Sequence, residues 1–360
     1  MTSMKRERLE ELLAGLVRSG GTSLHLSAGN GPWVRLAGRA VPTGDTPTEA
    51  TSLATLAGEL LFADQLARIE RGEEIDVVWA SNAGVRFRVS ALNHADGLGL
   101  VFRRLPDSAP RLADYELPEL LSAFTAMRRG LVLVTGPFGS GKSTTLAAMV
   151  ARIDEERAVN IVTLERRIEF VHACQNAVIH QREVGTHVAT VADGVREAFL
   201  IGADVVMVGE IVSADDLRAV LEAAEGGMLV LAGFEASSIV SAVSELPRLA
   251  PSMERANLQV RFADSLRAII GQTLIRRRHG RGKVPLLEIL VRNEPVARAI
   301  RRGRAELLPG LMAEGLGLGM QTAEQGLRRL MQRHVISEEE VQQHAARRMA
   351  MGQFASPSRV

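Results

Sequence analysis

The sequence predicts an α/β protein, with a small mixed domain first and a largely parallel sheet after it. Between residues 23 and 105, short alternating or apolar runs are separated by glycines, a pattern typical of strands. From residue 131, continuous apolar runs alternate with helical patterns, as expected for a sheet covered by helices on both faces. From about residue 292 to the end of the chain, helical patterns dominate.

The first domain is expected to span residues 1–105. Apolar residues recur at helical spacing within 5–18, and a glycine pair ends that helix. Strands are expected over 23–27, 32–38, 75–80, 84–93 and 97–105, with helices within 47–70. Three prolines and several turn formers between 106 and 118 predict a linker, which we place at 106–116.

The second domain is expected at 117–290, followed by a helical region at 291–360. Its strands are expected over 131–136, 160–165, 204–210 and 228–234, and its helices over 142–154, 192–201 and 215–225. The basic run at 276–283 is interpreted as a solvated turn before a strand at 285–290.

The segment 136–144 matches the phosphate-binding pattern G-x-x-x-x-G-K-[ST], between an expected strand and an expected helix. Its glycines let backbone N–H groups turn toward phosphate oxygens, and the helix N-terminus adds positive partial charge. Lys142 is expected to reach the β and γ phosphates of ATP, and Ser143 to bind Mg²⁺. The predicted nucleotide-binding residues are Gly136, Pro137, Phe138, Gly139, Ser140, Gly141, Lys142, Ser143 and Thr144.

Two carboxylates are candidates for the catalytic roles. Glu210 ends the apolar run 204–210, and Glu165 ends the run 160–165. In open α/β sheets, ligands bind at the carboxyl ends of the strands. Hydrolysis at a phosphate loop needs carboxylates that hold Mg²⁺ or orient water, so we predict Glu210 and Glu165 as catalytic.

Composition excludes several functional classes. The formal net charge is +1, and one tyrosine and two tryptophans offer few stacking surfaces, so no nucleic-acid partner is expected. No window approaches the ~20 apolar residues of a membrane span, so direct membrane insertion is not expected. The single cysteine, Cys174, fits a cytosolic location. His172, His180 and His187 fit no zinc spacing and are interpreted as loop or strand surface.

Several segments occur in an order that resembles the PilT/PilU retraction ATPases of the type II/IV secretion superfamily, over about residues 5–345. They are SLHLSAGNGPWVRLAG, VRFRVSALN, VFRRLP, GPFGSGKSTTLAAM, LERRIEFVH, HQREVG, DVVMVGE, LEAAEGG, GQTLI, AIRRGR and GMQT. The resemblance implies a PAS-like N-terminal domain, a RecA-like P-loop domain with added C-terminal helices, and a hexameric ring. It also implies ATP hydrolysis that removes pilin through an inner-membrane platform protein.

The chain departs from the family pattern at positions tied to hydrolysis. Arg166 stands in the acidic box where the family has Asp, and Glu235 stands where it has one of two histidines. The remaining departures are Arg167 for Pro, Val212 and Ser213 for Arg and Asp, Met228 for the other histidine, Leu200 for Arg (with Arg196 retained) and Phe138 for Thr. Hydrolysis needs preorganised charges around the transferred phosphoryl group, so these changes predict weakened or lost turnover.

Two functions remain open on these residues. The first is an accessory ATP-binding subunit of the pilus motor, in a homo-hexamer or in a mixed ring with an intact retraction ATPase. The second is an active hexameric retraction motor. Either would be cytoplasmic and peripheral to the inner membrane through the pilus machinery. A general secretion or pilus-extension ATPase is disfavoured, because one cysteine cannot supply the four-cysteine zinc module usual in those relatives.

Overall fold

The computed structural model describes residues 5–36, 38–44, 46–106, 108–115, 117–278 and 282–343. Parts of the expected linker (107 and 116), of the basic turn (279–281) and of the C-terminal helical region (344–360) lie outside the described residues, as does residue 37. Residue contacts divide the chain into two compact units. Unit 1 comprises Met1–Ser108 and Arg167–Val171, and unit 2 comprises Ala109–Arg166 and His172–Val360.

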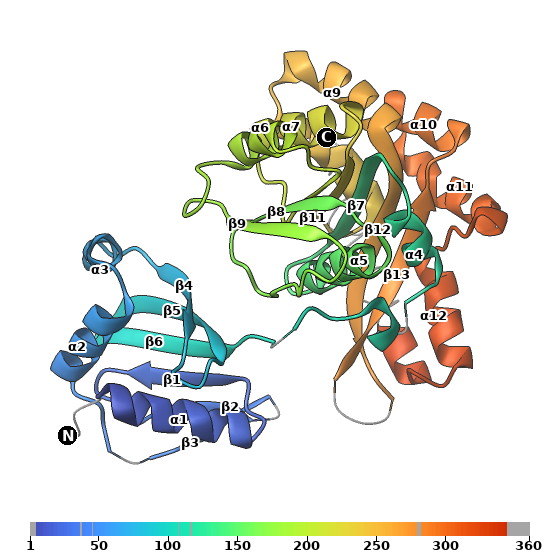
Figure 1. The fold of residues 1–360 in the computed structure, drawn as a ribbon. Helices are drawn as coiled ribbons and strands as arrows, with labels where there is room; N and C mark the ends of the chain where they lie inside the picture. The colour runs from blue at the N-terminus through green and yellow to red at the C-terminus, as the bar shows by residue number, and fades with distance from the viewer. Residues whose placement is uncertain are drawn as a thin grey trace, which may run out of the picture. The chain divides into compact units, whose positions relative to one another are not determined.

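Unit 1 is built on a six-stranded antiparallel sheet with the strand order β3-β2-β1-β6-β5-β4 (Figure 1). Its strands are β1 (Ser23–Ser27), β2 (Trp33–Leu36), β3 (Arg39–Pro42), β4 (Ile75–Ala80), β5 (Arg86–His94) and β6 (Gly97–Arg104). Its helices are α1 (Arg6–Arg18), α2 (Ala50–Leu60) and α3 (Ala63–Glu70). The leucines of α1 pack in one apolar cluster with Phe87 and Phe102 of the sheet.

Unit 2 is built on a seven-stranded sheet with the order β13-β12-β7-β11-β10-β8-β9, in which only the β12–β13 pair is antiparallel. The strands are β7 (Gly130–Gly136), β8 (Asn160–Glu165), β9 (Val178–Glu183), β10 (Val205–Val208), β11 (Leu229–Glu235), β12 (Leu266–Arg276) and β13 (Lys283–Val291). Helices join β7 to β8, β9 to β10, β10 to β11 and β11 to β12, as the alternating pattern predicts, whereas β8 and β9 are joined by a segment without a helix.

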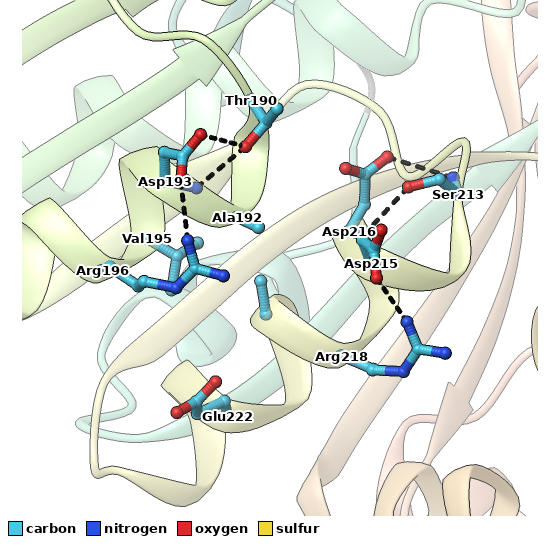
Figure 2. A pocket seen from close by; sticks show the side chains of 11 residues that line it. Thr190, Ala192, Asp193, Val195, Arg196, Ser213, Asp215, Asp216, Arg218 and Glu222 are labelled. Carbon is cyan, nitrogen blue, oxygen red and sulfur yellow. Dashed lines mark hydrogen bonds and ion pairs between the residues drawn. The ribbon is translucent and has the colours of Figure 1, made fainter. Parts of the chain in front are cut away.

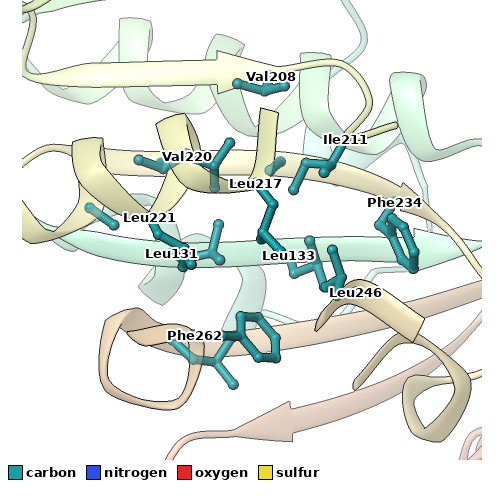
Figure 3. Close-up of a cluster of buried hydrophobic side chains, with 14 of the residues drawn as sticks. Leu131, Leu133, Val208, Ile211, Leu217, Val220, Leu221, Phe234, Leu246 and Phe262 are labelled. Atoms are coloured by element: carbon teal, nitrogen blue, oxygen red, sulfur yellow. The ribbon is translucent and has the colours of Figure 1, made fainter. Parts of the chain in front are cut away.

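Helices cover both faces of the unit 2 sheet, and each face has its own core. On one face, α4 (Leu120–Thr125) and α5 (Lys142–Glu156) pack on β7 and β11. On the other face lie α6 (Val191–Leu200), α7 (Ala214–Glu225), α8 (Ile239–Glu245), α9 (Ser252–Ser265), α10 (Glu294–Arg301) and α11 (Leu308–Glu314). Figure 3 shows part of this second core, where Leu217 and Leu221 of α7 pack toward Leu131 and Leu133 of β7.

Short helical turns complete unit 2, and α12 (Ala323–Gln332) packs on β13 in a small separate cluster. The turns are η1 (Leu112–Asp114), η2 (Leu246–Leu249), η3 (Ala305–Leu307) and η4 (Gly315–Leu318). Within the described residues, no helix is both long and apolar enough to span a membrane.

The predicted fold class is confirmed, but two edge strands escaped the sequence patterns. β3 exposes all four of its side chains, and β9 buries none of its side chains fully. The pattern that predicts a strand depends on a buried face, so an edge strand with little burial gives almost no signal. The basic run after residue 276 does connect two paired strands, because Arg276 of β12 lies opposite Lys283 of β13.

Candidate functional site

The predicted phosphate-loop residues lie between the end of β7 and the first turn of α5. Residues 137–139 are exposed, and the side chain of Phe138 is 83% exposed at the tip of the loop. Gly139 and Gly141 adopt positive φ angles of 72° and 89°, a region that glycine enters without strain. A Cβ atom on Gly136 would lie 2.2 Å from the backbone oxygen of Gln272, so only glycine fits there. The loop geometry therefore depends on glycine at these positions.

Lys142 folds back over the loop from the first turn of α5. Its Nζ donates to the backbone oxygens of Gly136 at 2.8 Å and Pro137 at 3.1 Å. Burial lowers the pKa of the Lys142 ammonium, and the carboxylates of Glu210 and Glu235 raise it in part. The ammonium group therefore binds two loop carbonyls and is acted on electrostatically by two carboxylates.

A glutamine from β12 braces the loop, and the sequence reasoning missed it. The side-chain amide of Gln272 donates from Nε2 to the Ser140 backbone oxygen at 2.8 Å. Its Oε1 accepts from Oγ1 of Thr145 in α5 at 2.7 Å. Gln272 is only 4% exposed, so both hydrogen bonds are made in a buried environment. No local motif signals this role, because the partners lie 132 and 127 residues away in the sequence.

The polar groups of the loop also suit the binding of an anion. The Ser140 side chain is 3% exposed, and its hydroxyl has no hydrogen-bond partner among the described residues. Ser143 is exposed in the first turn of α5, where the helix dipole favours negative charge. An unpartnered hydroxyl, an ammonium and a helix N-terminus at a glycine-lined loop fit a bound phosphate chain. Binding by these residues stays a prediction.

Three carboxylates follow neighbouring strands at the same edge of the sheet. Glu165 ends β8, Glu210 follows β10 by two residues, and Glu235 ends β11 next to β7. Glu165 is 8% exposed and accepts a hydrogen bond from Thr163 at 2.9 Å. Glu210 and Glu235 act electrostatically on Lys142. This edge of the sheet thus holds three acidic side chains, and two of them act on Lys142 of the phosphate loop.

Arg166 lines a pocket together with Glu210, one of the two predicted catalytic residues. The pocket has a volume of about 190 Å³ and is also lined by Val212, Ser213 and Asp216. The Asp216 carboxylate accepts hydrogen bonds from the backbone N–H groups of Val212 and Ser213. These bonds fix the segment after Glu210 against the first turn of α7, as part of a helix N-cap. The pocket lining therefore contains an arginine at the position where the resemblance implies an aspartate.

A larger pocket of about 500 Å³ opens between the N-terminal parts of α6 and α7 (Figure 2). Both arginines that line it are paired: Arg196 bonds Asp193 at 2.7 Å, and Arg218 contacts Asp215 and bonds Glu254 at 2.6 Å. Arg196, the arginine retained from the family pattern, is therefore held by a carboxylate of its own helix.

The interpretation of three histidines as surface residues is wrong for one of them. His172 is 7% exposed, and burial lowers the pKa of its imidazole to about 4. Its backbone N–H donates to the Gln181 side chain at 3.0 Å, which fixes the chain next to β9. A polar residue in a segment without a period carries no burial signal in the sequence, so tertiary packing decides its environment.

Known proteins resemble this chain across most of its length. The model of the family described as "Type II/IV secretion system protein" matches residues 62–354. The type IV pilus retraction ATPase PilT of Pseudomonas aeruginosa is 33% identical over 337 residues, covering 94% of this chain and 98% of PilT. The type IV pilus ATPase PilU of the same organism is 30% identical over 336 residues, covering 93% of this chain and 88% of PilU.

A solved structure of the pilus retraction motor PilT with bound ADP matches with a TM-score of 0.83 and 27% identity. The match covers 92% of this chain and 95% of that structure's chain. This chain therefore belongs to the type II/IV secretion system protein family, and within it is a homologue of the PilT and PilU retraction ATPases of type IV pili.

Proposed function

We propose that this chain binds ATP at its phosphate loop, hydrolyses it weakly or not at all, and serves as an accessory subunit of a type IV pilus retraction motor. The observation that supports this most is that the phosphate loop keeps its expected residues while residues at the neighbouring strand ends differ in charge from the family pattern. The phosphate loop is complete and braced by Gln272, whereas Arg166 and Glu235 bring altered charges to the edge where hydrolysis takes place.

Nucleotide binding is supported by the loop itself and by the relatives. The residues that would hold the phosphates are the backbone of 136–141, Lys142 and the first turn of α5, with Ser143 as the ligand for Mg²⁺. When bound, Mg²⁺ neutralises charge on the phosphate oxygens. The PilT structure that matches this chain contains ADP, which fits the same loop chemistry.

Weakened hydrolysis is supported by the charges around Glu210. Arg166 lines the same pocket as Glu210 and stands where the resemblance implies an aspartate, so the site lacks one carboxylate that could hold Mg²⁺ or orient water. Removal of one preorganised polar contact commonly lowers a rate about 10²–10³-fold. Here several such groups differ together, and their costs need not add.

An active hexameric retraction motor is the second candidate. It is favoured by Glu210 and Glu165, which both lie at the carboxyl edge of the sheet where a catalytic carboxylate is needed. In either case we propose a ring, either of identical chains or mixed with an intact retraction ATPase. We also propose a cytoplasmic location, docked on an inner-membrane platform protein of the pilus machinery.

A binding and turnover assay on the full-length protein separates these candidates. Calorimetry with ATP and ADP in the presence of Mg²⁺ measures affinity, and phosphate release measures turnover, with Lys142→Ala as the control. The accessory function predicts affinity that depends on Lys142 and turnover far below motor rates. Lys142-dependent turnover at motor rates would replace it with the motor. Absence of binding to both nucleotides would overturn both.

A further inference from the structure

Glu235 is an acidic residue whose backbone lies directly beside the start of the phosphate loop. It is the last residue of β11 and faces Gly136 across the parallel β11–β7 pair. Neighbouring strands in a sheet are about 4.8 Å apart, so the two backbones are in direct contact. The carbonyl of Gly136 is also the acceptor for the Lys142 ammonium at 2.8 Å. One residue therefore links the Glu235 backbone to the lysine that is expected to reach the terminal phosphate.

The side chain of Glu235 is directed to the same face of the sheet as α5. Side chains alternate between the two faces along a strand. In β11, Leu229 and Leu231 pack in the core that contains Met149 of α5, whereas Phe234 packs in the core on the opposite face. Glu235 has the same parity as Leu229 and Leu231, so it extends toward the N-terminus of α5. Its exposed side chain is free of the core there.

The two side-chain charges that act on the Lys142 ammonium are both acidic. Lys142 supplies one positive charge, and the first turn of α5 holds no acidic side chain but supplies a helix N-terminus. Against these stand the carboxylates of Glu210 and Glu235, and both act on the Lys142 ammonium. A phosphate loop must offset the charge of each phosphate that it accepts, and here part of that positive charge is already offset.

We propose that Glu235 makes this phosphate loop select a nucleoside diphosphate over a nucleoside triphosphate, because its carboxylate repels the terminal phosphate that Lys142 would otherwise hold. The inference rests on nucleotide binding at the loop, as proposed above. The β-phosphate is held mainly by the loop N–H groups and the helix N-terminus, which Glu235 leaves intact. Lys142 is expected to reach both the β- and the γ-phosphate, but only the β-phosphate also has the loop N–H groups, so the acidic residue acts mainly on the triphosphate.

The test is calorimetry on the full-length chain with ADP and with a non-hydrolysable ATP analogue, at one fixed Mg²⁺ concentration. The isosteric change Glu235→Gln removes the charge and keeps the shape. It is expected to tighten binding of the triphosphate about tenfold, equivalent to about 1.4 kcal/mol. Binding of ADP is expected to change less than about threefold. Glu245→Gln is the matched control, because Glu245 is exposed at the end of α8, on the opposite face of the sheet.

A second measurement does not depend on any variant. Charge repulsion between exposed groups is screened by salt, so the preference of the unmodified protein for ADP should shrink as ionic strength rises. An unmodified protein that binds the triphosphate analogue as tightly as ADP would overturn the inference. So would a Glu235→Gln variant with an unchanged ratio of the two affinities. Both results leave the proposed binding function standing, whereas loss of affinity for both nucleotides in the unmodified protein removes that function itself.

Discussion

Replacement of Gln272 by leucine is the sharpest test of how the phosphate loop is held. Leucine keeps much of the volume but removes the hydrogen bonds to the Ser140 backbone oxygen and to the Thr145 hydroxyl, at 2.8 and 2.7 Å. Each such bond contributes about 0.5–1.5 kcal/mol net, and a buried group left without a partner costs about 1–3 kcal/mol. The Thr145 hydroxyl can turn to a carbonyl of its own helix, so we expect a loss of about 2–4 kcal/mol in unfolding free energy.

The same change should weaken nucleotide binding about tenfold, because the loop backbone loses its fixed position. Gln321→Leu is the matched control. Gln321 donates to the Leu287 backbone oxygen at 2.7 Å in a half-buried site outside the phosphate loop. It should lower stability without lowering nucleotide affinity. A double-mutant cycle with Thr145→Val should give a coupling energy of about 1 kcal/mol. Thr145→Val alone leaves the Gln272 Oε1 atom without its donor, and the double variant no longer contains that atom.

The measurements are denaturant unfolding by circular dichroism, amide hydrogen exchange over residues 136–145, and calorimetry with ADP. Tryptophan fluorescence is unsuitable for this region, since Trp33 and Trp79 both belong to unit 1. Exchange at the loop should accelerate in Gln272→Leu and stay unchanged in Gln321→Leu. A Gln272→Leu protein with unaltered stability, loop exchange and affinity would refute the bracing role.

Three further changes test separate features. Gly136→Ala should lower nucleotide affinity more than tenfold by calorimetry, because its Cβ atom would lie 2.2 Å from a backbone oxygen. Gly139→Ala is its control: the added Cβ atom meets no atom within 4 Å, so the change should cost only about 1–2 kcal/mol in unfolding free energy. Asp154→Ala should cost about 2–4 kcal/mol in urea unfolding, because one carboxylate oxygen accepts the backbone N–H groups of residues 175, 176 and 177 at 2.9–3.1 Å. Burial lowers the pKa of His172 from its ordinary value of 6.5 to about 4 in the folded chain, so the unfolded chain binds more protons between these pH values. The unfolding free energy should therefore fall by up to about 3 kcal/mol as the pH drops from 6.5 to 4. His172→Asn should flatten that slope in urea titrations at several pH values.

The phosphate loop and the parallel strands could be predicted because their signals are local. The eight positions of the pattern, with a strand before them and a helix after them, are enough to predict a phosphate-binding turn. The strands next to the loop are buried on both faces, so they read as continuous apolar runs. The edge strands β3 and β9 lack such burial, and the sequence therefore holds no comparable sign of them.

The support for the loop could not be predicted, because it comes from a distant part of the chain. Gln272 is a polar residue within an apolar strand, and nothing near it shows which group it contacts. Only the pairing of β12 with β7 brings it against Ser140 and Thr145. The proposed role of Glu235 could be predicted in part, since the resemblance places it at a position tied to hydrolysis, but its register opposite Gly136 is a property of the assembled sheet.

Binding and hydrolysis depend on differently distributed parts of this fold, and that difference explains how one can be lost without the other. The predicted binding residues are consecutive in sequence and lie between a fully buried strand and its following helix, so their backbone positions are fixed by these two elements. The predicted catalytic residues are single side chains at or after the ends of separate strands: Glu165 is the last residue of β8, and Glu210 follows β10. Arg166 and Glu235 lie at such ends, beyond the core positions of β8 and β11. A strand end can therefore change its charge while the strand keeps its packing, so a chain of this architecture can lose turnover and retain nucleotide affinity.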